Sequence, residues 1–129
     1  MWLKSIAISV FFILMLYAVS CNKEEPNEPP VPCISGPWLN GNGASNDYLE
    51  WSVKSPLSVS ADCSTDPDSD TLTVRWDWTS DGNWDTHFIS IYTTVQYQYQ
   101  DTGWYELNLR VDDGKISIIK SARVHIKQD

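Results

Sequence analysis

The stretch from Tyr97 to Lys115, YQYQDTGWYELNLRVDDGK, decides the fold. Apolar and polar residues alternate along its second half, which predicts an extended strand with one buried face. The residues expected on that face are Tyr105, Leu107, Leu109 and Val111. Asp-Gly follows at positions 113 and 114, and this dipeptide is typical of a tight hairpin turn. The stretch therefore predicts one strand of a β-hairpin and the turn that leads into the next.

Similar short segments flank this hairpin on both sides. Alternation recurs in LSVSA (57–61), TLTVRWDW (71–78), FISIYTTVQYQYQ (88–100) and ISIIKSARVHIK (116–127). Within 71–78, Trp76 and Trp78 are expected inside, whereas Arg75 and Asp77 are expected on the opposite face. The isoleucines at 116, 118 and 119 do not keep one parity, which indicates a bulge. About seven short strands predict an all-β, antiparallel β-sandwich.

Composition limits the classes of function. The 129 residues suffice for one domain, and the net charge of −8 disfavours nucleic acid as a partner because phosphates are repelled. The two histidines, His87 and His125, have no nucleophile motif beside them, and neither G-x-S-x-G nor H-E-x-x-H occurs. No motif requires a cofactor. We therefore expect no catalytic residues and no enzyme activity.

Asp101, Gly103 and Tyr105 have the spacing of the tyrosine corner of immunoglobulin-like domains. Together with PPVPCISGP (29–37) and STDPDSDTLTVRWDW (64–78), the opening stretch resembles the PKD domain, named after polycystic kidney disease. The resemblance covers residues 30–127 and implies an immunoglobulin-like sandwich. It departs at Ser69, where the family usually has Gly. PKD domains generally mediate protein–protein or protein–carbohydrate contacts, so the resemblance implies a non-catalytic binding role.

The N-terminal segment differs in composition from the rest. Lys4 precedes an apolar run from Ile6 to Val19, which is short for a membrane span and typical of a signal peptide. AVSC (18–21) resembles the lipobox of bacterial lipoproteins, which implies removal of residues 1–20 and lipidation of Cys21. The alternatives are an ordinary signal peptide or an uncleaved anchor. The resemblance implies export and membrane attachment through the lipid.

Residues 21–32 are predicted to be a linker. They are charged and Pro-rich, and such a chain reaches roughly 30 Å at about 3.1 Å per residue. The start, CNKEE (21–25), resembles signals that send lipoproteins to the outer face of an outer membrane. Residues 33–129 then form the predicted sandwich domain.

If Cys21 is lipidated, Cys33 and Cys63 remain as a pair. Exported proteins meet an oxidising environment, so a disulfide is expected between them. The alternative is two free buried thiols.

Two acidic segments could supply oxygen ligands to Ca²⁺. One holds Asp66, Asp68 and Asp70, and the other, which we favour, holds Asp81, Asn83 and Asp85. Some PKD domains bind Ca²⁺. No Glu closes either loop, and turn aspartates often hydrogen-bond their own backbone, which is the alternative.

Two of the seven tryptophans are candidates for ligand binding. Trp104 has the opposite parity to Tyr105 and should face outward, and Trp84 lies in a predicted loop. Exposed indoles serve as recognition surfaces, whereas buried ones only pack. The sequence thus predicts an outer-membrane lipoprotein that binds a protein or glycan. The alternative is a structural spacer or assembly subunit of an envelope complex without its own ligand.

Overall fold

A computed structural model describes residues 24–39 and 47–129. These residues form eight strands in two sheets and no helix, which confirms the predicted all-β sandwich with one strand more than expected. No helix in these ranges could therefore cross a membrane. The proposed signal peptide and Cys21 lie outside the described residues.

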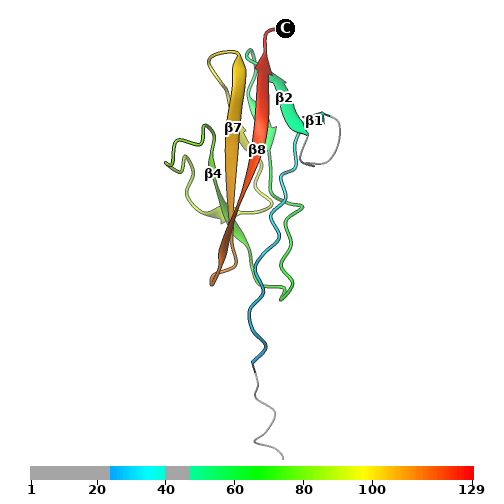
Figure 1. The fold of residues 1–129 in the computed structure, drawn as a ribbon, viewed down its shortest axis with the longest axis vertical. Coiled ribbons are helices and arrows are strands. Elements are labelled where there is room, and N and C mark those ends of the chain that lie inside the picture. Colours follow the sequence, from blue (N-terminus) through cyan, green and yellow to red (C-terminus); the bar gives the residue numbers. More distant parts are fainter. Residues whose placement is uncertain (1–23, 40–46) are drawn as a thin grey trace, which may run out of the picture.

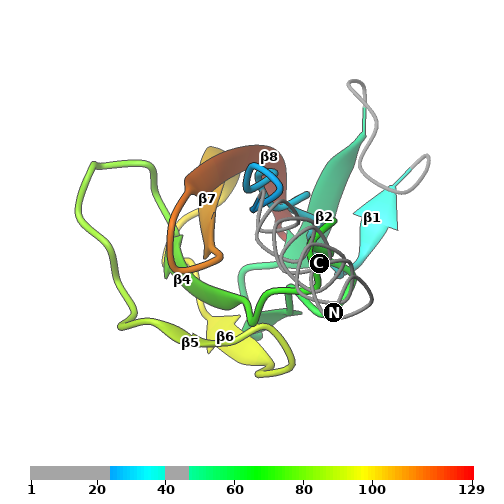
Figure 2. The ribbon, with the colours of Figure 1, turned by 90° about the horizontal axis from the view of Figure 1, so that it is seen from below.

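The strands are β1 (Trp38–Leu39), β2 (Tyr48–Ser52), β3 (Leu57–Val59), β4 (Thr73–Asp77), β5 (Ile89–Ser90), β6 (Val95–Tyr97), β7 (Gly103–Asp112) and β8 (Ser117–Lys127). Six of them form one sheet in the order β1-β2-β8-β7-β4-β5, and β3 pairs with β6 in a second sheet. The long strands β7 and β8 lie at the centre of the larger sheet (Figure 1). A view along the long axis shows β6 across the interior from β8 (Figure 2).

Strands β7 and β8 form the predicted hairpin. Their antiparallel register is continuous over ten residue pairs, from Gly103–Ile126 to Asp112–Ser117. The predicted bulge near the isoleucines is therefore wrong. The inference from alternation failed because Ile119 faces solvent and is 58 % exposed. The break in alternation is therefore caused by an exposed apolar residue in a regular strand. Gly114 turns the chain with a φ of 91°, which glycine adopts without steric cost.

The sandwich is not purely antiparallel. β2 pairs in parallel with β8, with Leu49 opposite Val124 and Trp51 opposite Ile126. Parallel neighbours need a long connection, and here most of the domain lies between the two strands. Alternation shows which face of a strand is buried but not the direction of the strand beside it, so the sequence could not predict this pair.

The core contains the inward residues of both sheets, and Trp76, Leu107 and Leu109 are completely buried. A row of aromatic rings continues from Trp76 through the interior. Trp76 stacks on Trp78 at 5.9 Å between ring centroids, and Trp78 stacks on Tyr97 at 5.2 Å. These contacts confirm that Trp76 and Trp78 belong to the core.

Asp77 was expected on the outer face but is only 2 % exposed. Its carboxylate accepts hydrogen bonds from the backbone N–H groups of Thr79, Asp81 and Gly82. The loop after β4 therefore folds back over this carboxylate. Such N–H donors stabilise a buried carboxylate, and this explains why an acidic residue can end a core strand.

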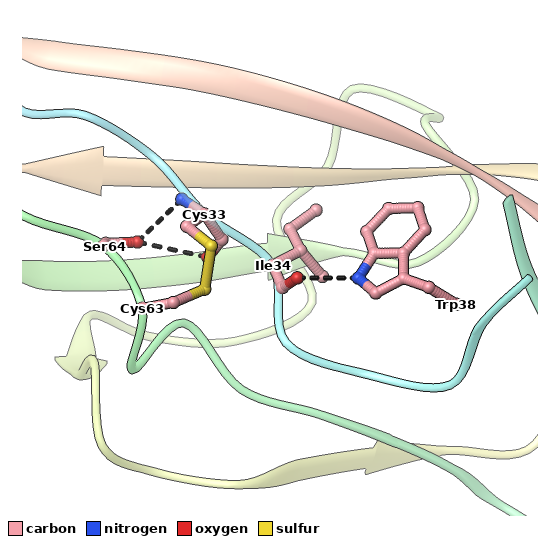
Figure 3. Close-up of a disulfide and its surroundings, with 5 residues drawn as sticks. All are labelled: Cys33, Ile34, Trp38, Cys63 and Ser64. Atoms are coloured by element: carbon pink, nitrogen blue, oxygen red, sulfur yellow. Dashed lines mark hydrogen bonds between the residues drawn. A yellow bond between two sulfur atoms is a disulfide. The ribbon is translucent and has the colours of Figure 1, made fainter. Parts of the chain in front are cut away.

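Cys33 and Cys63 form the predicted disulfide, with 5.3 Å between their Cα atoms (Figure 3). Isolated antiparallel bridges at Val31–Thr65 and Ser35–Ser60 lie on either side of it. The Ser64 hydroxyl also accepts a hydrogen bond from the Cys33 N–H and donates one to the Cys33 carbonyl. The extended N-terminal segment is thus fastened along the domain.

The described chain begins at one pole of the elongated domain and ends at the other (Figure 1). Near the first pole, the side chain of Asn27 donates to Asp113 in the β7–β8 turn. The opposite pole holds the end of β8 and therefore the start of β7. Residues at the start of β7 consequently lie far from Asn27 and the first described residues.

Candidate binding surface

Trp104 is the most exposed described tryptophan. It follows Gly103 at the start of β7, where its neighbour Tyr105 packs against the core. Strand geometry sends successive side chains to opposite faces, so Trp104 lies on the outer face of the six-stranded sheet. Its side chain is 56 % exposed, as the parity argument predicted.

Neighbouring rings hold this indole in place. His125, directly opposite Trp104 on β8, stacks on it with 4.4 Å between centroids and 15° between planes. Tyr48 of β2 meets the indole edge to face at 5.0 Å. The three rings come from the adjacent strands β2, β8 and β7 and form a fixed aromatic platform, which we define as Tyr48, Trp104 and His125.

Glu50 orients the imidazole from the next strand. Its Oε2 lies 3.1 Å from His125 Nδ1, and its Oε1 accepts a hydrogen bond of 2.6 Å from Lys127 Nζ. The hydrogen bond from Lys127 lowers the pKa of Glu50 below its usual value, and the contact with His125 lowers it further by a smaller amount. The carboxylate therefore stays ionised near neutral pH and keeps the platform's histidine in one orientation.

A hollow of about 510 Å³ adjoins the platform and is lined by Trp104, Tyr105, Glu106 and Arg123. The guanidinium carbon of Arg123 lies 5.6 Å from the centre of the indole ring. An apolar ring beside charged hydrogen-bonding groups suits a ligand that has both apolar faces and hydroxyl or amide groups.

The second predicted tryptophan lies elsewhere. Trp84 is half-buried in the loop between β4 and β5, and its ring lies 4.9 Å from the guanidinium carbon of Arg75. Arg75 pairs with Arg110, six residues beyond Trp104 on β7, which is roughly 20 Å at the rise of a strand. Trp84 and Trp104 therefore do not form one platform.

The favoured calcium loop uses its side chains for turn formation. Asp81 accepts a hydrogen bond from the Asn83 N–H, and Asp85 accepts one from the Trp78 N–H. Among the described residues these carboxylates do not join any group of three potential metal ligands. The geometry matches the alternative of turn aspartates, and calcium at this loop stays an untested prediction.

A different acidic cluster could hold a metal ion. Ligand oxygens of Asp66, Asp70 and Asp113 lie within 4.8 Å of one another. Asp113 also receives hydrogen bonds from Asn27 and from the Ile116 backbone, and these lower its pKa. Oδ2 of both Asp66 and Asp70 is covered and lacks a hydrogen bond, although Lys115 Nζ lies 3.5 Å from Asp70 Oδ2. The hairpin turn brings Asp113 to the other two, which the sequence does not reveal.

Sequence reasoning missed Tyr48 and His125 as parts of the platform. The outward parity of His125 was readable, but its position opposite Trp104 depends on the hairpin register. Tyr48 could not be predicted as part of the platform, because its place beside β8 depends on the parallel pairing of β2 with β8. The other histidine, His87, is exposed in the loop before β5.

Comparison with known proteins now fixes the family. The model of the PKD domain matches residues 45–127. The chain belongs to the PKD domain family. PKD domains of this size are typically non-catalytic, and no catalytic family was found. No curated protein matches this chain.

Two solved structures resemble this PKD domain. One is a nucleoside hydrolase-related protein from Saccharophagus degradans, described as associated with carbohydrate metabolism, with 26 % identity and a TM-score of 0.55 over 89 % of this chain. The other is the extracellular domain of a hybrid two-component system from B. thetaiotaomicron, with 12 % identity and a TM-score of 0.47 over 84 % of this chain. The matches span 29 % and 16 % of those chains, so this protein resembles only part of each.

Proposed function

We propose that this PKD domain is a non-catalytic binding module that contacts a carbohydrate or a protein through the platform of Tyr48, Trp104 and His125. The observation that carries the proposal is Trp104, which is 56 % exposed although it is held between His125 and Tyr48. A rigid, exposed indole offers a large contact area at little entropic cost, and Trp is enriched where binding energy concentrates.

The place of the platform supports this role. It lies beside the end of β8, at the pole opposite the first described residues of the chain (Figure 1). If the chain is tethered through its N-terminus, the platform points away from the tether. The similar protein from S. degradans is associated with carbohydrate metabolism, and this favours a carbohydrate ligand.

We further propose that Cys21 is lipidated and anchors the chain to an outer membrane, with the domain exposed. The disulfide between Cys33 and Cys63 supports export because such bonds persist in oxidising compartments. Mass spectrometry of the membrane fraction tests the anchor. We expect a mature N-terminus at Cys21 with attached acyl chains, and an unmodified Cys21 would refute the anchor.

A paired glycan-array and pull-down screen with the full chain, purified in mild detergent, tests the binding role. We expect at least one reproducible ligand, together with quenching of tryptophan fluorescence when it is added. Silence in both screens without quenching would favour the alternative of a structural spacer. A spacer is expected to bury its tryptophans. Trp38 and Trp51 favour that alternative because they pack against the core, although they lie near its edge.

For a metal ion we propose Ca²⁺ at Asp66, Asp70 and Asp113 in place of the loop that contains Asp81. The support is chemical, since three carboxylates converge there and two of their oxygens lack hydrogen bonds. Millimolar Ca²⁺ should raise the melting temperature relative to a chelator, and Asp70→Asn should abolish that rise. If Asp81→Asn abolishes it instead, the ion binds in the other loop.

A further inference from the structure

Two arginines lie side by side on the outer face of this acidic domain. Arg75 of β4 and Arg110 of β7 are directly opposite each other in the antiparallel register. Like charges at such positions repel each other and destabilise the sheet. The pair therefore needs compensation from its surroundings or from a ligand.

Aromatic rings supply part of that compensation. The Phe88 ring centre lies 4.7 Å from the guanidinium carbon of Arg75 and 5.6 Å from that of Arg110, and Trp84 lies on Arg75 as well. Ring faces attract cations and hold the planar groups in a fixed orientation. Phe88 is nevertheless 43 % exposed, so the cluster is open to solvent on one side.

The hydrogen-bond donors of the two guanidinium groups are almost unused. Arg110 donates one bond, from Nη2 to the Ser117 hydroxyl at 3.0 Å. In the described part of the chain the Arg75 side chain makes no hydrogen bond or ion pair, and Nε of both arginines is covered without a partner. Asp112, on the same face of β7, instead accepts hydrogen bonds from Ser117 and from the Gly114 backbone. The free donors at the Nη ends are therefore the ones that a ligand would meet.

We propose that Arg75 and Arg110, framed by Phe88 and Trp84, form a subsite for the carboxylate of an acidic sugar in a polysaccharide. A planar guanidinium matches a carboxylate in a bidentate manner, and two adjacent guanidinium groups would lose their mutual repulsion when an anion binds between them. The neighbouring rings provide faces for the sugar itself. The subsite lies on the same sheet face as Trp104, and its ligand class rests on the proposed binding function.

The surface between the subsite and the platform favours a glycan over an acidic peptide. Along this face Asn108, Ser80 and Ser121 form a hydrogen-bonded row of amide and hydroxyl groups. Such groups exchange hydrogen bonds readily with sugar hydroxyls, whereas the side chains of an acidic peptide offer only carboxylates. From the arginine pair towards Trp104, the face thus presents a charged site, a neutral polar row, the exposed Glu106 and the indole.

Calorimetry with a galacturonate oligosaccharide tests the subsite, with its fully methyl-esterified form as the uncharged counterpart. The full chain in detergent is titrated at about 0.15 M salt, where distant charges are largely screened. We expect the acidic oligosaccharide to bind at least about tenfold more tightly than the ester. Arg75→Gln and Arg110→Gln should each remove that preference, and Arg110→Lys should reduce it because the planar fork is lost. Lys54→Gln makes the same charge change in the turn after β2, outside the subsite, and should leave the preference intact.

An NMR readout locates the binding independently of folding defects in the variants. The chain has three arginines, and covered Nε–H groups exchange slowly enough to be observed. The signals of Arg75 and Arg110 should shift with the acidic oligosaccharide alone. Unshifted signals, or equal affinity for acid and ester, would overturn the inference, as would an oligoglutamate peptide that binds there more tightly. If both sugars bind equally and Trp104 is required for binding, the proposed function stands and the subsite at Arg75 and Arg110 is refuted.

Discussion

Tyr99 and Tyr105 each donate a hydroxyl hydrogen bond to a backbone carbonyl, but their surroundings differ. Tyr99 reaches Trp78 O at 2.7 Å in the core, and Tyr105 reaches Asp101 O at 2.8 Å in an exposed setting, as a tyrosine corner does. Tyr99→Phe leaves a buried carbonyl without a donor and should lower the free energy of unfolding by about 1–3 kcal/mol. Tyr105→Phe should cost only about 0.5–1.5 kcal/mol. Urea unfolding compares the two variants, and an equal or reversed order would contradict the assignment.

Alkaline pH gives a second test of Tyr99. Burial raises the pKa of its hydroxyl well above the ordinary value of 10.0. Above pH 10 the unfolded chain loses this proton while the folded protein retains it, so stability that is complete below pH 10 declines as pH rises. Between pH 9 and 11, the free energy of unfolding should fall less steeply for Tyr99→Phe than for the natural protein. Parallel curves would show that Tyr99 ionises equally well in both states.

At the scale of elements, the disulfide joins the N-terminal segment to the turn after β3. It links residues separated by 30 positions, and closing such a loop stabilises a fold by about 3–4 kcal/mol in the chain-entropy model. The double substitution Cys33→Ser with Cys63→Ser should lower the free energy of unfolding by that amount. A reductant should then destabilise the natural protein but not the variant, and identical urea midpoints for all samples would refute a stabilising role.

Alternation and turn chemistry were enough to predict the hairpin, the buried face of β7 and the outward position of Trp104. They could not predict neighbours that depend on pairing between distant strands. Tyr48 reaches Trp104 through the parallel pair of β2 and β8, and Asp113 reaches Asp66 through the turn. Asp77 was misplaced because parity ignores a loop that can fold over the end of a strand.

At the scale of the whole molecule, the two proposed sites lie at opposite ends of the domain's long axis. The first described residues and the acidic cluster lie at one pole, and the aromatic platform lies at the other (Figure 1). The family resemblance seen in the sequence was correct over residues 45–127, because PKD motifs occur in turns and core strands that define the sandwich. Those motifs do not specify a ligand, so the proposed binding surface is inferred from the exposure of Trp104 and the geometry of the rings around it.

The binding role of Trp104 is the central claim, and a glycan array probed with the natural protein and Trp104→Ala tests it most directly. Tyr92→Ala serves as the control, since Tyr92 is an exposed aromatic residue in the turn after β5 and belongs to neither proposed binding site. All three proteins should show similar melting temperatures, because Trp104 is 56 % exposed and Tyr92 is 76 % exposed. We expect Trp104→Ala to lose at least about tenfold in affinity for neutral glycans, in line with a tryptophan at the centre of a binding surface, while Tyr92→Ala keeps that affinity. Unchanged binding by Trp104→Ala would contradict the account.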